Sequence, residues 1–127
     1  MIEAMPFAAA LGMRLIEAAP TRAVAELLVR DDLCTTNSVL HGGAVMAFAD
    51  SLGAIVAMLN LPEGAATTTL ESKTNFVGAV RAGETARAVC ETVHIGRATM
   101  VVQTRVYRGD GKLAAMVTQT QMTLPKP

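Results

Sequence analysis

One long apolar run, Gly42 to Leu59, sets the first limit on how this chain folds, and a single carboxylate, Asp50, lies near its centre. The only other side chain in the run with a hydrogen-bonding group, the sulfurs apart, is Ser51. An unpaired ionised carboxylate in apolar surroundings costs several kcal/mol, so such a residue is usually paired, neutralised or open to a cleft. Because functional sites favour that arrangement, Asp50 is the leading candidate for a reactive group.

The start of the run predicts a second functional element. The sequence His41-Gly42-Gly43 precedes a stretch of helix formers, so we predict a helix that begins at Gly42 or Gly43. The first backbone N–H groups of a helix have no intrahelical partner and carry the positive end of its dipole. They can therefore bind a carbonyl oxygen or a developing oxyanion, which places a donor site and a carboxylate on one element.

The run has two other interpretations. Its length is close to that of a membrane span, but a central Asp50, several glycines and the lack of a flanking Lys/Arg cluster argue against one. We therefore expect no membrane partner. A buried core helix whose Asp50 makes only structural hydrogen bonds stays open on these residues alone.

The composition predicts one globular domain, residues 1–127, that associates with itself. Hydrophobic residues make up 51% of the chain and charged residues 17%, and the mean hydropathy is +0.37. A monomer of this size would expose much of that apolar surface, so a second copy is expected to cover part of it. Zero net charge, four aromatic residues and no Trp argue against nucleic-acid binding. The first residues lack a signal-peptide pattern, so a cytoplasmic location is expected.

The cysteines and histidines give little support to other chemistries. Cys34 and Cys90 match no metal or redox spacing and are expected to be free thiols. A nucleophilic pair of Cys34 with His41 lacks a third, orienting group. His94 is expected at a surface or strand edge, and two distant histidines give no basis for a metal site.

The rest of the chain is typical of β-strands. Alternating residues and turn signals predict a hairpin followed, after the helix, by a meander. The predicted strands are Met13–Ala18, Arg22–Arg30, Thr67–Val77, Thr85–Ile95, Ala98–Tyr107 and Leu113–Leu124. Since one face of the sheet must be buried and one helix is available, we predict an α+β fold in which an antiparallel sheet wraps around a single long helix.

Together these residues resemble a known family. The quoted features are His41-Gly42-Gly43, Asp50 nine positions after that histidine, the strand Thr69-Leu70-Glu71-Ser72-Lys73-Thr74-Asn75-Phe76, and Gly96-Arg97 before a long strand. This pattern is similar to that of the hotdog-fold acyl-CoA thioesterases, in particular the phenylacetate-degradation and 4-hydroxybenzoyl-CoA thioesterase type. The resemblance spans nearly the whole chain.

The resemblance implies a mechanism and an assembly. The N–H of Gly43, with Gly42, would polarise the thioester carbonyl, and Asp50 of the neighbouring subunit would act as nucleophile or general base. Thr69 would help to position the attacking water. His41 would hold the loop and hydrogen-bond near the thioester. The working unit would be a homodimer and, beyond that, a dimer of dimers.

For the substrate, the resemblance implies an acyl-CoA that is hydrolysed to free acid and coenzyme A, without a metal or other cofactor. Arg97, next to Gly96, and Arg81 would lie near the phosphates of coenzyme A. Relatives commonly carry an Asn six residues before the histidine, where this chain has Thr35. Either the loop shifts so that Asn37 serves in its place, or this role is lost.

Two other functions remain as alternatives. A non-hydrolytic acyl-CoA-binding or sensing protein could keep the fold and the donor site, but it would gain nothing from Asp50 beside a carbonyl. A hotdog-fold dehydratase or hydratase fits His41-Gly42-Gly43 poorly. The side chains Met46, Phe48, Leu52 and Met58 could line an acyl pocket, and for most of them a place in the core is expected.

Overall fold

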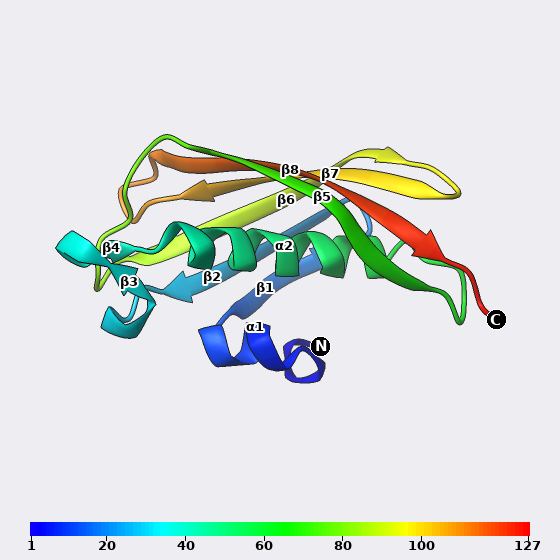
Figure 1. Cartoon of the computed structure of the whole chain (residues 1–127), viewed down its shortest axis with the longest axis horizontal. Helices are drawn as coiled ribbons and strands as arrows, with labels where there is room; N and C mark the ends of the chain where they lie inside the picture. The colour runs from blue at the N-terminus through cyan, green and yellow to red at the C-terminus, as the bar shows by residue number, and fades with distance from the viewer.

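A curved antiparallel sheet wraps around one long helix, as Figure 1 shows for the computed structural model, which describes all residues from Met1 to Pro127. The sheet has six strands in the order β1-β2-β6-β7-β8-β5, and a separate two-stranded ribbon joins β3 and β4. The predicted α+β architecture is confirmed. The helices and strands are α1 (Pro6–Leu11), β1 (Arg14–Ala19), β2 (Arg22–Leu28), β3 (Cys34–Thr35), β4 (Val39–Leu40), α2 (Gly42–Met58), β5 (Ala66–Phe76), β6 (Thr85–Ile95), β7 (Thr99–Tyr107) and β8 (Leu113–Leu124). Short 3-10 turns occupy Ile2–Ala4, Asp31–Leu33 and Thr36–Ser38.

Helix α2 fills the concave side of the sheet, and this explains its apolar sequence. Phe48, Leu52, Ile55 and Val56 are completely buried against the strands. Truncating a buried phenylalanine to alanine costs about 3–5 kcal/mol of stability, so Phe48 is a principal core residue. The predicted start of the helix is confirmed at Gly42. No helix of the structure is both long and apolar enough to cross a lipid bilayer.

The strand predictions are largely confirmed. The observed bounds of β6 and β8 coincide with the predicted ranges Thr85–Ile95 and Leu113–Leu124. On β7, Met100, Val102, Thr104 and Val106 share the buried face. Their spacing of two residues is the alternation expected of a strand with one face in the core.

One short helix and two short strands were not predicted. Helix α1 lies outside α2 and β1 (Figure 1), so the chain has a second, short helix. It begins with Pro6 and ends at Gly12, whose φ of 81° is the left-handed conformation favoured by glycine. Strands β3 and β4 have two residues each and are too short to give a periodic signal.

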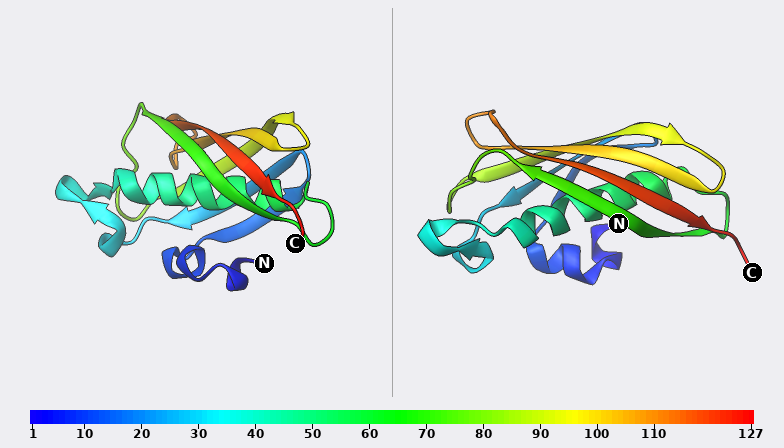
Figure 2. Two further views of the ribbon diagram at one scale, coloured as in Figure 1. Left: turned by 45° about the vertical axis from the view of Figure 1, so that its right-hand side comes forward. Right: turned by 45° about the horizontal axis from the view of Figure 1, so that its top comes forward.

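Strand β5 forms one edge of the sheet and leaves its outer side without a partner strand. Figure 2 shows β5 and β8 side by side, with β5 outermost. A bulge between Thr69 and Glu71 moves the inward face from Thr69 to Ser72. Exposed apolar side chains lie along and after this edge at Leu70, Phe76 and Val77. An edge that is both long and apolar favours association with another chain.

Candidate active site

Asp50 lies in the middle of α2 at the wall of a cavity. The side chain is partly buried, and the cavity has a volume of about 310 Å³. Its lining residues are Phe7, Met46, Ala47, Asp50, Ser51, Thr69 and Ser72. Of the predicted acyl-pocket candidates, Met46 lines this cavity, whereas Phe48 and Leu52 belong to the core. The carboxylate is therefore open to a small chamber rather than sealed in the core.

A hydrogen-bond network holds one oxygen of this carboxylate. The Thr69 hydroxyl donates to Asp50 Oδ1 at 2.8 Å, and the Gln119 amide donates to the same oxygen at 2.9 Å. Behind Thr69, the Gln121 amide donates to the Thr69 hydroxyl at 2.6 Å. The other oxygen, Oδ2, receives no hydrogen bond from the chain. Thr69, which the sequence placed near the reactive group, is thus in direct contact with Asp50.

The N-terminus of α2 has one free donor. The N–H of Gly43 donates to His41 Nδ1 at 2.8 Å, so the imidazole caps the helix. The next two N–H groups donate to the His41 carbonyl oxygen. The N–H of Gly42 makes no hydrogen bond within the chain. Of the two glycines, only Gly42 has an N–H without an acceptor in the chain. His41 Nδ1 acts as an acceptor, so the ring proton of a neutral imidazole lies on Nε2.

A second cavity, of about 250 Å³, lies at this end of the helix. It is lined by Phe7, Leu11, Asp32, Leu33, Cys34, His41, Gly43 and Ala44. Phe7 lines both this cavity and the one at Asp50, and 66% of its surface is exposed. Phe7 of α1 is therefore shared by the two cavities.

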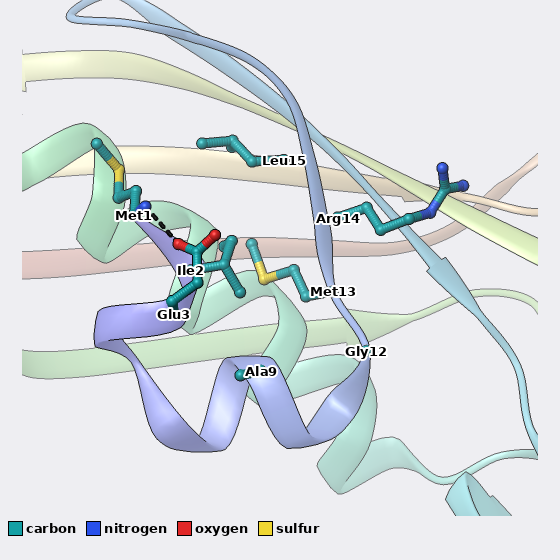
Figure 3. A pocket seen from close by; sticks show the side chains of 8 residues that line it. All are labelled: Met1, Ile2, Glu3, Ala9, Gly12, Met13, Arg14 and Leu15. Atoms are coloured by element: carbon teal, nitrogen blue, oxygen red, sulfur yellow. Dashed lines mark hydrogen bonds and ion pairs between the residues drawn. The ribbon is translucent and has the colours of Figure 1, made fainter.

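The largest cavity, of about 510 Å³, lies elsewhere, between the N-terminal turn and the start of β1 (Figure 3). The Met1 ammonium donates to the Glu3 carboxylate at 2.7 Å and lowers the pKa of Glu3. Arg14 is paired with Glu26, outside the cavity, at 2.9 Å. Neither Asp50 nor His41 lines this cavity, so its size does not make it the reactive site.

The structure does not bring the predicted substrate-binding residues together within one chain. Asn37 lies between β3 and β4 with a φ of 65°, its side chain makes no hydrogen bond, and it lines neither helix-side cavity. Arg81 and Arg97 lie beyond opposite ends of the eleven-residue strand β6, which at 3.3 Å per residue separates them by roughly 35 Å. Gly96 has a structural explanation, because a Cβ there would lie 2.8 Å from the Thr99 carbonyl oxygen.

Sequence reasoning missed three residues around Asp50, namely Gln119, Gln121 and Gly53. The two glutamines are each 1% exposed on β8, where the alternation of the strand turns them toward α2. Gly53 faces Gln119 across the helix surface. A usable signal was present in the sequence, since a strand that buries Ala115 and Val117 continues on the same face with glutamines.

Comparisons with known proteins agree with this geometry. The family model described as "Thioesterase superfamily" matches residues 37–115. A putative esterase of Bacillus subtilis, ComA2, is 32% identical over 92% of this chain and 93% of its own length. The 1,4-dihydroxy-2-naphthoyl-CoA hydrolase of Escherichia coli is 32% identical over 59% of this chain and 54% of its own. A mutant of the phenylacetic acid degradation protein PaaI from Thermus thermophilus superposes with a TM-score of 0.85, at 30% identity over 92% of this chain and 97% of its own.

The fold is therefore a hotdog fold, as the resemblance implied. The chain belongs to the thioesterase superfamily and is a thioester hydrolase. The predictions of family and of enzyme class are confirmed.

Proposed function

We propose that this protein is an acyl-CoA thioesterase that hydrolyses the thioester to free acid and coenzyme A at a site shared by two subunits. The observation that carries the proposal is the way in which the Asp50 carboxylate is hydrogen-bonded. Its Oδ1 accepts two hydrogen bonds, and its Oδ2 is free beside an apolar cavity. A carboxylate held in one orientation with one reactive oxygen is suited to act as nucleophile or general base.

The oxyanion donor in this proposal is the N–H of Gly42, supported by Gly43. The Gly42 N–H has no acceptor in the chain, whereas the Gly43 N–H is engaged by His41. A carbonyl that approaches the helix end along its axis meets the free donor and the positive end of the dipole. Both favour the tetrahedral oxyanion more than the neutral carbonyl, which is the requirement for catalysis.

One chain alone cannot use both groups on one thioester. Gly42 and Asp50 are eight residues apart on α2, which at 1.5 Å per residue corresponds to about 12 Å along the axis. A reacting carbonyl needs donor and carboxylate within about 3–3.5 Å of its atoms. A second subunit related by a two-fold axis perpendicular to α2 removes the conflict, because its α2 then runs in the opposite direction and brings Gly42 of the partner subunit toward Asp50.

The surface supports such a dimer. The long free edge of β5 can pair with the same edge of a second copy. The face of α2 that carries Asp50 also presents Met46 and Met58, which are 37% and 39% exposed. Antiparallel pairing of two β5 edges would also place Arg97 of the partner subunit at the end of the molecule where Arg81 lies. The two arginines could then bind phosphates of one coenzyme A.

In the proposed reaction, Asp50 Oδ2 either attacks the thioester carbon or takes a proton from a water that attacks it. The developing oxyanion accepts the hydrogen bond from the N–H of Gly42 of the partner subunit. Collapse of the tetrahedral intermediate breaks the C–S bond, and the leaving thiolate of coenzyme A takes a proton from solvent in the nucleophilic route or the proton held by Asp50 in the general-base route. In the nucleophilic route, water then hydrolyses the acyl-aspartate. Phe7, Met46 and Ala47 give the acyl chamber an apolar lining, which favours an aryl or short-to-medium alkyl group.

A hydrolysis screen tests the activity. Aromatic, short-chain and medium-chain acyl-CoAs are incubated with the protein, and released thiol is detected optically, with Asp50→Asn as the control. We expect turnover of at least one class and its loss in the control. A protein that binds acyl-CoAs but hydrolyses none of them would contradict the proposal.

A subunit-mixing experiment tests the shared site. Asp50→Asn and Gly42→Val subunits, each inactive alone, are unfolded, mixed and refolded together. We expect about one quarter of wild-type activity, because random pairing makes half of the dimers mixed and each mixed dimer contains one intact site. A mixture that stays inactive, while refolded wild type recovers, would place both groups in one chain. The variant Gly43→Val in place of Gly42→Val compares the two candidate donors.

A further inference from the structure

Two buried glutamines of β8 form the wall behind Asp50, and the proposed mechanism does not use them. Gln119 and Gln121 are each 1% exposed and occupy positions of the strand that face α2. Polar side chains at such positions are rare in a core unless they make specific hydrogen bonds. The inference drawn from them rests on the proposed function, because it concerns how Asp50 is held.

The hydrogen bonds of this wall have a fixed direction. Thr67 donates its hydroxyl hydrogen to Gln121 Oε1 at 3.0 Å or to the Met122 carbonyl oxygen at 3.0 Å. Gln121 Nε2 donates to the Thr69 hydroxyl at 2.6 Å. Since Thr69 accepts from an amide, its own hydrogen is directed to Asp50 Oδ1, 2.8 Å away. In this arrangement the relay delivers a donor to Asp50 Oδ1.

Gln119 supplies the second hydrogen-bond donor to Asp50, although its own carbonyl oxygen is left without a partner. Its Nε2 donates to Asp50 Oδ1 at 2.9 Å, but its Oε1 is buried without any hydrogen-bond partner. A buried carbonyl without a donor is destabilising. The protein nevertheless keeps this amide against the helix rather than an apolar side chain.

Gly53 makes room for that amide. A Cβ at this position would overlap the Gln119 side chain, with Nε2 only 2.8 Å away. Glycine in the middle of a helix is itself unfavourable relative to alanine. The contact between Gly53 and Gln119 therefore combines two locally unfavourable features, a buried carbonyl without a donor and a glycine within a helix. The same Gln119 side chain donates a hydrogen bond to Asp50. Departures from local preference of this kind are expected at functional sites.

We propose that Gln119, which fits against α2 because residue 53 is glycine, is a positioning residue that acts with the Thr67–Gln121–Thr69 relay. It fixes the Asp50 carboxylate through Oδ1 and leaves Oδ2 directed at the substrate. Two donors on one oxygen define the plane of the carboxylate, which a single hydrogen bond does not. The role is geometric, so the loss of Gln119 should reduce the chemical step and leave substrate binding nearly unchanged.

The test uses four variants that change the same contact from both sides. Gln119→Ala removes the donor and leaves a hole, and Gly53→Ala pushes the amide away from Asp50. The double variant Gly53→Ala/Gln119→Ala puts a methyl group on the helix where the amide was. Gln119→Met removes the donor while it keeps most of the volume. Gln103→Ala is the matched control, since Gln103 lies on β7 and contacts Thr118 instead of Asp50.

We expect Gln119→Ala, Gln119→Met and Gly53→Ala each to lower kcat by about 10- to 100-fold with little change in KM, the scale of a misplaced reactive group. The double variant should regain thermal stability relative to Gln119→Ala without regaining kcat. Gly53→Ala should have no further effect on kcat once Gln119 is absent. Gln103→Ala should keep wild-type kcat.

Recovery of kcat together with melting temperature in the double variant would overturn the proposal, because Gln119 would then be only a packing residue. Wild-type kcat in soluble, folded Gln119→Met would overturn it as well, even if Gln119→Ala failed to fold. Asp50→Asn separates this proposal from the function. If Asp50→Asn is inactive and the Gln119 variants are active, only the positioning role fails. If Asp50→Asn is fully active, the proposed mechanism itself fails.

Discussion

The two ends of the first half of α2 differ in how they are held. At Asp50, side chains from β5 and β8 converge on one carboxylate oxygen, and the neighbouring core is fully buried. At the helix N-terminus, the only side-chain contact to a backbone N–H comes from His41, the residue that immediately precedes the helix. One end is fixed by three elements, and the other mainly by its own cap.

This difference indicates how the proposed site is assembled. The position of the carboxylate is complete within one chain, whereas the Gly42 N–H and the apolar surface around it still lack partners. A site formed between two copies requires a rigid reactive group and an open donor. Each copy then contributes its fixed carboxylate to one site and its free backbone N–H to the other. Substitutions near Asp50 should therefore mainly affect the chemical step. Substitutions at the helix N-terminus should affect the chemical step, the stability of the protein and the access of substrate.

The largest effect is expected from Asp50→Asn, which should lower kcat on the best acyl-CoA by at least about 100-fold. The asparagine Oδ1 can still accept from Thr69 and Gln119, so the fold should persist. Removal of a partly buried charge should leave thermal stability unchanged or raise it. Thiol-release kinetics and a melting curve measure both. Near-normal kcat in a clean preparation would remove Asp50 from the mechanism.

Next in size is the loss expected from a side chain at the helix N-terminus. Gly42→Val should lower kcat/KM by about 100-fold, the scale of one oxyanion donor. Its Cβ would lie 3.3 Å from the Phe76 ring, which is 54% exposed and can move, so folding should be retained.

Gly43→Val is the matched comparison. Its Cβ would lie 2.9 Å from His41 Nδ1 and would displace the cap before it obstructs a ligand. We therefore expect a smaller loss of kcat/KM than for Gly42→Val, together with lower stability. The reverse order would return the main donor role to Gly43, the residue that the resemblance indicated.

The contrast between the two ends also explains what could be predicted from the sequence. The helix start, Asp50 and the strand ranges Thr85–Ile95 and Leu113–Leu124 follow from local pattern, because periodicity and glycine position act over a few residues. The nearness of Thr69 to Asp50 came from the family resemblance. None of this requires knowledge of tertiary packing.

The missed features depend on contacts between distant parts of the chain. Gln119 reaches Asp50 across 69 positions, and no local rule pairs them. The bulge after Thr69 changes the inward face of β5 within a stretch that otherwise alternates. Helix α1 has six residues, so its signals were Pro6 and Gly12 rather than periodicity. Tertiary packing determines these features, and the sequence contains only local signals of them.

A moderate effect on stability is expected from the cap. His41→Ala removes the acceptor of the Gly43 N–H and should lower the free energy of unfolding by about 0.5–2 kcal/mol. His41→Asn should restore most of it, because asparagine is a good N-cap residue. Urea unfolding of the three proteins at equal subunit concentration measures the difference. Equal stability of all three would show that the imidazole contributes little as a cap.

The smallest effect is expected in the reactivity of the two thiols. The thiol near the helix N-terminus and the thiol in the core should again differ. Cys34 lies at the helix N-terminus and lines the cavity with His41 and Gly43. Cys90 is completely buried, and this burial raises its pKa to about 11. Because the thiolate is the reactive form, Cys90 should stay inert in the folded protein at pH 8.

We expect a disulfide reagent to titrate one thiol rapidly in the native protein and the second only after denaturation, and Cys34→Ser should abolish the rapid phase. The folded pKa of Cys90 lies above its unfolded value of about 9, so its contribution to stability is present below pH 9 and is lost as the pH rises toward 11. An unreactive acyl-CoA analogue should slow the labelling of Cys34, because the thioester would enter beside Gly43. Labelling that is indifferent to a bound analogue would place the substrate away from the helix N-terminus, and the open end of α2 would then need another explanation.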